Sequence, residues 1–347
     1  MKEAHTETLW FCLVAIMIAG YAVFDGFDLG AGIVHLFVAR SEAERRSVLA
    51  SVGPVWDGNE VWLLAGGGVL FFAFPAVYAS GFQGFYLPLI IVLWLLILRG
   101  IAIEFRNKVS SLVWYPLWDV VFAGASAMLA IFFGAAIGNV VRGVPLDHSG
   151  FFFLPLWANL RLMPTAGILD WFTIIVALGS FAALTVHGAL WVAMKTEGAV
   201  AARAHQAAEV AWWAVLVITA LLVIIVPLVQ PHLGHRFADA PWGFVFPLAA
   251  AIGMFGMKLL NGAGRPMAAF LASCLYIVGM LTSAAFGLYP YLLPSSTDAA
   301  AGLAVSNSAA GSYGLTVGLY WFIPGMALVA VYFVFVYRLS AREKIAH

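Results

Sequence analysis

Four acidic side chains lie in apolar sequence near the N-terminus. Asp25 and Asp28 belong to the segment GYAVFDGFDLGAG, and Asp57 and Glu60 belong to PVWDGNEVW. A charge at the centre of a membrane-spanning helix costs about 2.5–3.5 kcal/mol, so a carboxylate kept there indicates a function. Two carboxylates three residues apart share one face of a helix, and their mutual repulsion favours binding of a proton. Both pairs of carboxyl groups are therefore predicted to hold and pass protons.

Two further acids lie at the ends of apolar segments. Glu104 ends one segment and Asp119 begins the next, with Arg99, Arg106 and Lys108 close by in the sequence. These basic side chains offer a second interpretation, in which some acids are neutralised as structural ion pairs. The predicted proton pathway comprises all six acids: Asp25, Asp28, Asp57, Glu60, Glu104 and Asp119.

The composition explains where these acids must lie. Hydrophobic residues make up 63% of the 347 residues, charged residues make up 10%, and the net charge is zero. These values predict a polytopic membrane protein with a single transmembrane domain over residues 1–347. Since no run of Lys or Arg is present, a nucleic-acid-binding surface is not expected. Cys12 and Cys274 lie in separate apolar segments, which does not support a disulfide framework or a cysteine-bound metal.

Nine apolar segments are each long enough to cross about 30 Å of hydrocarbon. Strand-like alternation does not interrupt them, so we expect an all-α protein with nine transmembrane helices and an uncleaved first span. The segments are Leu9–Val38, Val52–Ala79, Phe82–Ile103, Leu117–Val141, Leu169–Met194, Ala208–Val229, Trp242–Leu260, Met267–Leu288 and Leu315–Tyr337.

The distribution of Lys and Arg predicts the orientation in the membrane. The C-terminus and the loops after the first, third, fifth and seventh segments hold 13 basic residues, whereas the opposite side holds 4, namely Lys2, Arg142, Arg161 and Arg236. Basic residues are enriched on the cytoplasmic side. We therefore expect an outside N-terminus, a cytoplasmic C-terminus, and six candidate acids in the inner half of the membrane.

Histidines give no sign of a haem site. His187 is the only histidine deep inside a segment, and His35 and His205 lie near segment ends. A haem bound inside a helical bundle needs axial ligands at opposed positions, which these residues do not supply. The sequence also lacks Walker, GxSxG and HExxH motifs.

Several motifs together resemble a known family. They are GYAVFDGFDLGAG, ERRSVLASVGPVWDGNEVWLLAGGG, GFYLPLIIVLWLLILRGIAIEFRNK, Trp118-Asp119, Gly138-Asn139, the RGVP segment from Arg142, and YPYLLPSST over Tyr289–Thr297. In this order they resemble subunit II of cytochrome bd-type quinol oxidases, including the cyanide-insensitive branch. Residues 143–185 and 195–265 resemble it only loosely.

The resemblance implies a fold and a role. It implies two four-helix bundles, about 1–141 and 165–288, plus an extra helix at about 315–337. It implies pairing with the haem-bearing subunit I, which carries haems b and d and the quinol-oxidation loop, while this chain binds no haem. Asp25, Asp28, Asp57 and Glu104 occupy motif positions thought to help deliver cytoplasmic protons to the oxygen-reduction site, and Glu60 stands where some members have Gln.

Further expectations follow from the same resemblance. The chain would lie in the bacterial inner membrane among lipids and meet quinol and O₂ through the complex. A structural quinone in this subunit and a small single-span accessory subunit are alternatives that it leaves open. Two other functions also stay open: a proton-coupled secondary transporter, which would favour broken helices and an inverted repeat, and a purely structural membrane partner.

Overall fold

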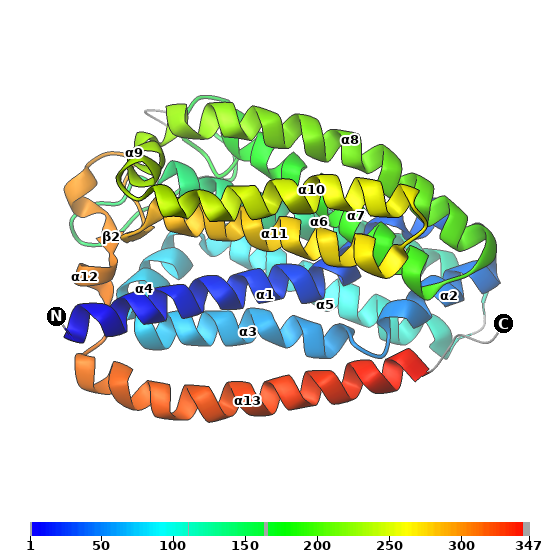
Figure 1. The fold of residues 1–347 in the computed structure, drawn as a ribbon. Helices are drawn as coiled ribbons and strands as arrows, with labels where there is room; N and C mark the ends of the chain where they lie inside the picture. Colours follow the sequence, from blue (N-terminus) through cyan, green and yellow to red (C-terminus); the bar gives the residue numbers. More distant parts are fainter. Residues whose placement is uncertain (1, 110, 163–165, 343–347) are drawn as a thin grey trace.

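The computed structural model describes residues 2–109, 111–162 and 166–342 (Figure 1). Its helices are α1 (Lys2–Val38), α2 (Glu42–Val52), α3 (Trp56–Ala73), α4 (Pro75–Gly84), α5 (Tyr86–Phe105), α6 (Trp114–Arg142), α7 (Trp171–Lys195), α8 (Gly198–Val229), α9 (Pro231–Asp239), α10 (Val245–Gly262), α11 (Pro266–Leu288), α12 (Val305–Ser308) and α13 (Ser312–Arg342). Short 3₁₀ turns occupy Arg106–Lys108, Pro241–Phe244 and Ala299–Ala301. The all-α prediction is confirmed.

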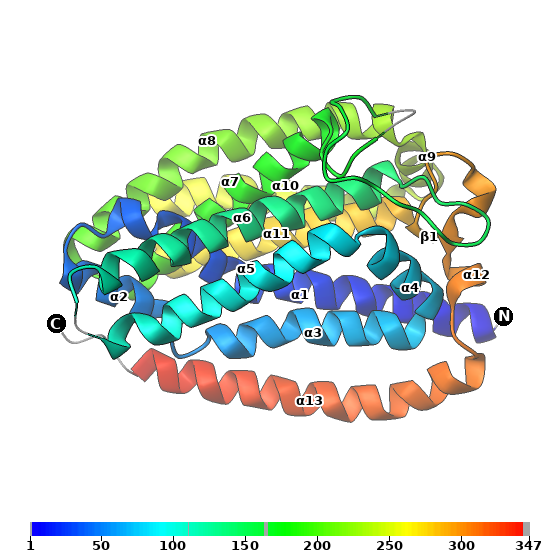
Figure 2. The same cartoon turned by 180° about the vertical axis from the view of Figure 1, so that it is seen from behind.

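One small sheet lies between α11 and α13. Strands β1 (Tyr291–Leu293) and β2 (Leu303–Ala304) pair antiparallel, with Tyr291 opposite Ala304 and Leu293 opposite Leu303. The sheet, α9 and α12 lie at the end of the bundle where α1 begins, whereas α2 lies at the end where α13 finishes (Figures 1 and 2). We call these the α12 end and the α2 end.

The prediction of one continuous helix over the second segment, Val52–Ala79, is wrong. Gly53 and Pro54 separate α2 from α3, and Pro75 begins α4 at its first position. Proline cannot donate the backbone hydrogen bond that a helix interior needs, but it fits the first turn of a new helix. The third predicted segment, Phe82–Ile103, consequently begins later, since α4 runs to Gly84 and α5 starts at Tyr86.

The predicted count of nine membrane helices is not confirmed. Eight helices within the described residues are long and apolar enough to cross a membrane. The remaining candidate is α3, whose 18 residues span about 27 Å but include Asp57, Asn59 and Glu60. Both views place α3 beside α1 and α13 (Figures 1 and 2). This position favours a ninth membrane crossing by α3, which stays a prediction.

Helix α1 is the centre of the packing. It contacts α3, α6, α7 and α11, and in both views it runs between α3 and α11. It therefore joins the two predicted bundles, whose boundaries stay a prediction. The contact with α7 is very close: a Cβ on Gly30 would overlap the Leu184 carbonyl oxygen and lie 2.6 Å from the Gly188 nitrogen. Small residues permit such close approach of membrane helices.

The close contact between α1 and α7 leads to a first prediction. Gly30→Val should destabilise the fold by about 1–3 kcal/mol, because the added side chain forces the two backbones apart. The measurement is the midpoint of thermal unfolding of the purified protein. Gly67→Val is the matched control, since a Cβ on Gly67 of α3 meets nothing within 4 Å. Equal midpoints for the two variants would contradict the prediction.

Candidate functional site

A row of polar side chains follows one face of α1. Tyr21, Asp25, Asp28 and His35 recur at intervals of four, three and seven residues, which keeps them on one side of the helix. Asp25, Asp28 and His35 are all 0% exposed. The row extends from the middle of α1 toward the α2 end. The structure thus confirms the shared face expected for Asp25 and Asp28, and adds His35 to it.

Arg99 of α5 reaches the middle of this row. Its Nη1 donates to Asp25 Oδ1 at 2.6 Å, and its Nη2 donates to Glu60 Oε2 at 2.9 Å. Arg99 is 0% exposed, whereas the Glu60 side chain is 25% exposed. A buried charge of either sign is costly unless it is paired, so this guanidinium holds α1, α3 and α5 together.

Asp28 is held by neutral groups. Asn59 of α3 donates from Nδ2 to Asp28 Oδ2 at 2.8 Å, and the Tyr337 hydroxyl of α13 donates to Asn59 Oδ1 at 2.9 Å. Each aspartate keeps one oxygen, Oδ2 of Asp25 and Oδ1 of Asp28, that is buried and has no hydrogen-bond partner within the described residues. Such oxygens are available to bind a proton or a water molecule.

A second cluster surrounds Asp119 of α6 near the α2 end. Its Oδ1 accepts hydrogen bonds from His35 Nε2 at 2.7 Å and from Arg106 Nε at 2.6 Å. Its Oδ2 accepts from Arg45 Nη1 and from Arg106 Nη2, each at 3.0 Å. Arg106 also pairs with Glu42 of α2 at 2.8 Å. Asp119 is therefore a charged acceptor that fastens α1, α2 and α6 together.

Helix α2 carries a third acidic contact outside the membrane helices. The Glu44 side chain completes a capping box with Ser41 and forms an ion pair with Arg203 of α8 at 2.6 Å. Arg203 also donates from Nε to the Val38 carbonyl oxygen at 2.6 Å. The hydrogen bonds from Arg203 and from the Arg40 and Ser41 backbones lower the pKa of Glu44 from its usual 4.5 to about 2. Glu44 thereby attaches α2 to the end of α1 and to α8.

Two candidate acids lie at the surface. Asp57 is exposed and accepts from the Gly58 backbone nitrogen at 2.7 Å, and Glu104 is exposed and accepts from Trp56 Nε1 at 3.3 Å. Both side chains thus lie on the surface of this chain, and the depth of Asp57 in the membrane stays a prediction. Asp57 belongs to the first turn of α3, directly after the turn at Gly53, whereas Asn59 and Glu60 reach the buried row.

A groove of about 390 Å³ separates α3 from α5 beside these acids. Glu60 and Glu104 are its carboxylates, and its other walls are mostly apolar, including Leu64, Leu93 and Phe105. Since Glu60 also binds Arg99, this groove connects an exposed surface with the buried network. The structure thus brings Asp25, Asp28 and Glu60 together, and places Asp57, Glu104 and Asp119 around them in separate contacts.

Sequence reasoning missed several members of the site. The sequence places His35 only near a segment end. Its spacing of seven residues from Asp28, which is two helical turns, is the signal that would have placed both on one face. Asn59 lies between Asp57 and Glu60 in the same motif, and its role could have been inferred from that position. Tyr337 comes from the last helix, so no local signal predicted its contact with Asn59.

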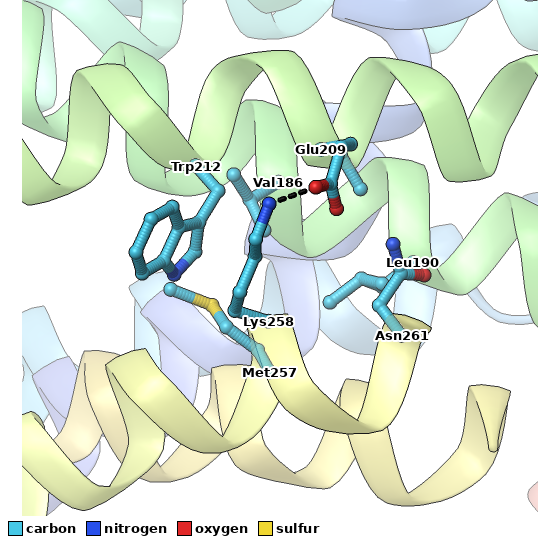
Figure 3. Close-up of a pocket in the computed structure, with 8 residues that line it drawn as sticks. Val186, Leu190, Glu209, Trp212, Met257, Lys258 and Asn261 are labelled. Carbon is cyan, nitrogen blue, oxygen red and sulfur yellow. Dashed lines mark hydrogen bonds and ion pairs between the residues drawn. The ribbon is translucent and has the colours of Figure 1, made fainter. Parts of the chain in front are cut away.

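A small cavity of about 10 Å³ lies elsewhere, between α7, α8 and α10. Lys258 forms an ion pair with Glu209 there (Figure 3), and its Nζ lies 5.1 Å from the centre of the Trp212 ring. This arrangement fastens α10 to α8. Within the described residues, no group of three or more His, Cys, Asp or Glu side chains could hold a metal ion.

Comparisons with known proteins agree with each other. A family model described as cytochrome bd terminal oxidase subunit II matches residues 6–340. The chain is similar to cytochrome bd ubiquinol oxidase subunit 2 of Bacillus subtilis (33% identity, 99% of this chain and 100% of the relative). It is also similar to cytochrome bd-I ubiquinol oxidase subunit 2 of Escherichia coli K12 (30% identity, 89% and 87%).

A solved structure is similar in fold. The bd oxidase from Geobacillus thermodenitrificans contains a chain that matches with a TM-score of 0.75 at 17% sequence identity, over 98% of this chain and 100% of that one. At this identity the match concerns the fold alone.

The buried ion pair leads to a second prediction. Arg99→Leu should destabilise the protein by about 3–5 kcal/mol, because it leaves the Asp25 carboxylate buried without its partner. Arg99→Leu combined with Asp25→Asn should recover part of that loss, since removing both charges of a buried pair is often nearly neutral. The measurement is thermal unfolding of the purified protein. A single Arg99→Leu variant as stable as the wild type would refute the role of the pair.

The contact of Glu44 leads to a third prediction. Its pKa is lower in the folded protein, so its stabilising effect is complete above about pH 4.5 and is lost as the pH falls toward about 2. The difference in unfolding midpoint between wild type and Glu44→Gln should therefore shrink over that range. Glu197→Gln is the control, since Glu197 makes no side-chain capping bond to α8. A difference that stays constant with pH would contradict the assignment.

Proposed function

The chain belongs to the cytochrome bd terminal oxidase subunit II family, and from that membership we propose two roles for it: stabilising the haem-bearing subunit I and conducting protons to the site of oxygen reduction. As such a subunit it is a component of a membrane oxidoreductase, and the haems of that oxidase lie in the partner subunit. Those haems supply the electron transfer to O₂. This chain's own residues would hold and move protons.

The observation that carries the proposal is the charge balance around Arg99. Asp25, Asp28 and Glu60 gather near a single guanidinium, and both aspartates are fully buried. Three carboxylates beside one cation would leave uncompensated negative charge in a low-dielectric interior, which is costly. Protonation of part of the network relieves that cost. A group of carboxyl groups that exchanges protons inside the membrane is the property that a proton path needs.

The groove suggests where protons are taken up. Glu104 is exposed at the groove, Glu60 lines it, and Arg99 connects Glu60 to Asp25. Asp57 lies at the same end of α3 and is the second acid at the surface. We place this end toward the cytoplasm, with the N-terminus periplasmic and the C-terminus cytoplasmic, because the basic residues of the loops concentrate there.

The stabilising role rests on the helix surfaces. Large apolar side chains are exposed along α5, α8 and α13, including Trp94, Val217 and Phe335. Surfaces of this kind suit lipid and the helices of subunit I. A purely structural function is the main competing hypothesis, and the ion pair between Arg99 and Asp25 favours it. A secondary transporter lacks a comparable supporting observation.

A fourth prediction separates proton conduction from structural support. Asp28→Asn in the assembled oxidase should slow oxygen consumption with quinol by about tenfold or more, because Asn keeps the size of the side chain but cannot carry a proton. Haem content, read from the reduced-minus-oxidised spectrum, should be unchanged. The control is Asp239→Asn at the α12 end of the bundle.

The outcomes distinguish the two hypotheses. Loss of haem in Asp28→Asn would indicate a structural role. Wild-type turnover with full haem content, from about pH 6 to 9, would remove Asp28 from the path. The same pair of measurements on Asp57→Asn tests whether this exposed acid takes part in proton uptake.

A further inference from the structure

We propose that His35 is a proton-transfer residue that connects the Asp119 cluster to Asp28. The inference rests on the proposed proton path and extends it by a second buried branch along α1. His35 is 0% exposed and lies one step beyond the acids on the same face of α1. Three observations support it: the contact of its ring with Asp119, its second ring nitrogen, and the polar atoms between it and Asp28.

The contact with Asp119 determines the state of the ring. Asp119 is bound by Arg45 and Arg106, so it is ionised and can only accept hydrogen bonds. His35 Nε2, at 2.7 Å from Asp119 Oδ1, must therefore be the donor. In the neutral imidazole this leaves Nδ1 as a proton acceptor. Asp119 acts as a positioning residue, since two arginines keep its own carboxylate charged.

The second ring nitrogen is not used by the fold. His35 Nδ1 is buried and has no hydrogen-bond partner within the described residues. Among the described residues, the other fully buried histidine is His187 of α7, and it differs in this respect. Its Nδ1 bonds to Ser273 Oγ at 2.7 Å, and its Nε2 bonds to the Val23 carbonyl oxygen at 2.9 Å. One histidine is thus fully engaged in structure, whereas the other keeps a basic nitrogen.

Polar atoms lie between His35 and Asp28. The two residues are seven positions apart, about 10.5 Å along the helix axis. Gly32 lies between them, and a Cβ at that position would overlap Ser126 Oγ of α6. Ser126 Oγ is buried without a partner in the described chain, as is Asp28 Oδ1. The glycine therefore lets a hydroxyl group lie against α1 midway between the imidazole and the carboxyl group.

The charges around His35 favour passing a proton on to Asp28 over keeping it on the ring. The groups that face His35 are Asp119 of α6 and, through it, Arg45 of α2 and Arg106, which pairs with Glu42. Arg46 also pairs with Glu42 at 3.0 Å, so three arginines already face two carboxylates when the ring is neutral. Farther along, Arg203 of α8 binds the end of α1 at Val38, and His187 lies beside Gly26. A proton on His35 adds one uncompensated charge, which its transfer to Asp28 removes.

The step balances without any co-reactant. A hydrated proton (H₃O⁺) at the α2 end transfers its proton to Nδ1 and is left as a neutral water molecule, while an N–H bond forms and the ring becomes an imidazolium next to the Asp119 carboxylate. That N–H bond then breaks, and the proton passes through the Ser126 hydroxyl, which accepts one proton and donates its own, to Oδ1 of Asp28. The imidazole returns to its neutral form, and the carboxylate becomes a carboxylic acid.

The test uses His35→Gln in the complete oxidase. Gln can still donate from its amide to Asp119 but cannot bind a proton. Oxygen consumption with quinol should fall by about tenfold or more, its solvent deuterium isotope effect should rise, and haem content should stay at the wild-type level. The matched control is His187→Gln, which removes an equally buried histidine and should leave turnover and the isotope effect unchanged.

The results discriminate among the alternatives. Wild-type turnover and isotope effect in assembled His35→Gln, with slow turnover in Asp28→Asn, would overturn the role of His35 and leave the proposed path intact. Wild-type turnover in both variants would overturn the proposed path itself. If His35→Gln does not assemble, Ser126→Ala tests the same route without touching the Asp119 cluster. Slower turnover supports the proposal, and unchanged turnover refutes it.

Discussion

Arg99 is the interaction on which the inner part of the structure depends. Its guanidinium is fully buried and binds Asp25 of α1 and Glu60 of α3 from a position on α5. A buried charge of either sign is costly unless it is paired, so the Asp25 carboxylate and the Arg99 guanidinium each stabilise the other inside the bundle. Because three helices must meet at this point, the pair also determines how α3 and α5 lie against α1. The contacts of Arg99 with Asp25 and Glu60 therefore both hold the helices together and balance the charges of the proposed proton path.

Glycines allow those contacts to form. Gly30 lets the backbones of α1 and α7 come into direct contact, and Gly32 lets Ser126 of α6 lie against α1. The same helix thus has a small-residue surface for packing and a polar row for protons. At the α2 end, Asp119 and Glu44 attach α2 to α6 and α8. The polar row consequently lies between a central ion pair and a second ionic cluster, both fixed by several helices.

The local patterns predicted the helices more accurately than their ends. Apolar segments long enough to span a membrane appear as helices because lipid leaves the backbone no other way to satisfy its hydrogen bonds. The segment from Val52 to Ala79 was the exception, because Gly53, Pro54 and Pro75 divide it. Asp57 illustrates the same difficulty. Its spacing of three residues from Glu60 predicts a pair on one helix face. Because a turn lies just before α3, Asp57 is exposed in the first turn of the helix, whereas Glu60 is partly buried.

By itself, the sequence determined the class of the protein and the identity of its unusual residues. A chain with 63% hydrophobic and only 10% charged residues is expected to fold in a membrane, and it must have a reason to keep Asp25 and Asp28 in apolar sequence. Only the tertiary structure decided how the charges are balanced. Arg99, Asn59 and Ser126 reach α1 from three other helices, and Tyr337 of α13 holds Asn59 in place. The spacing of residues along one helix describes a single face, whereas the partners of that face depend on how distant helices pack against it.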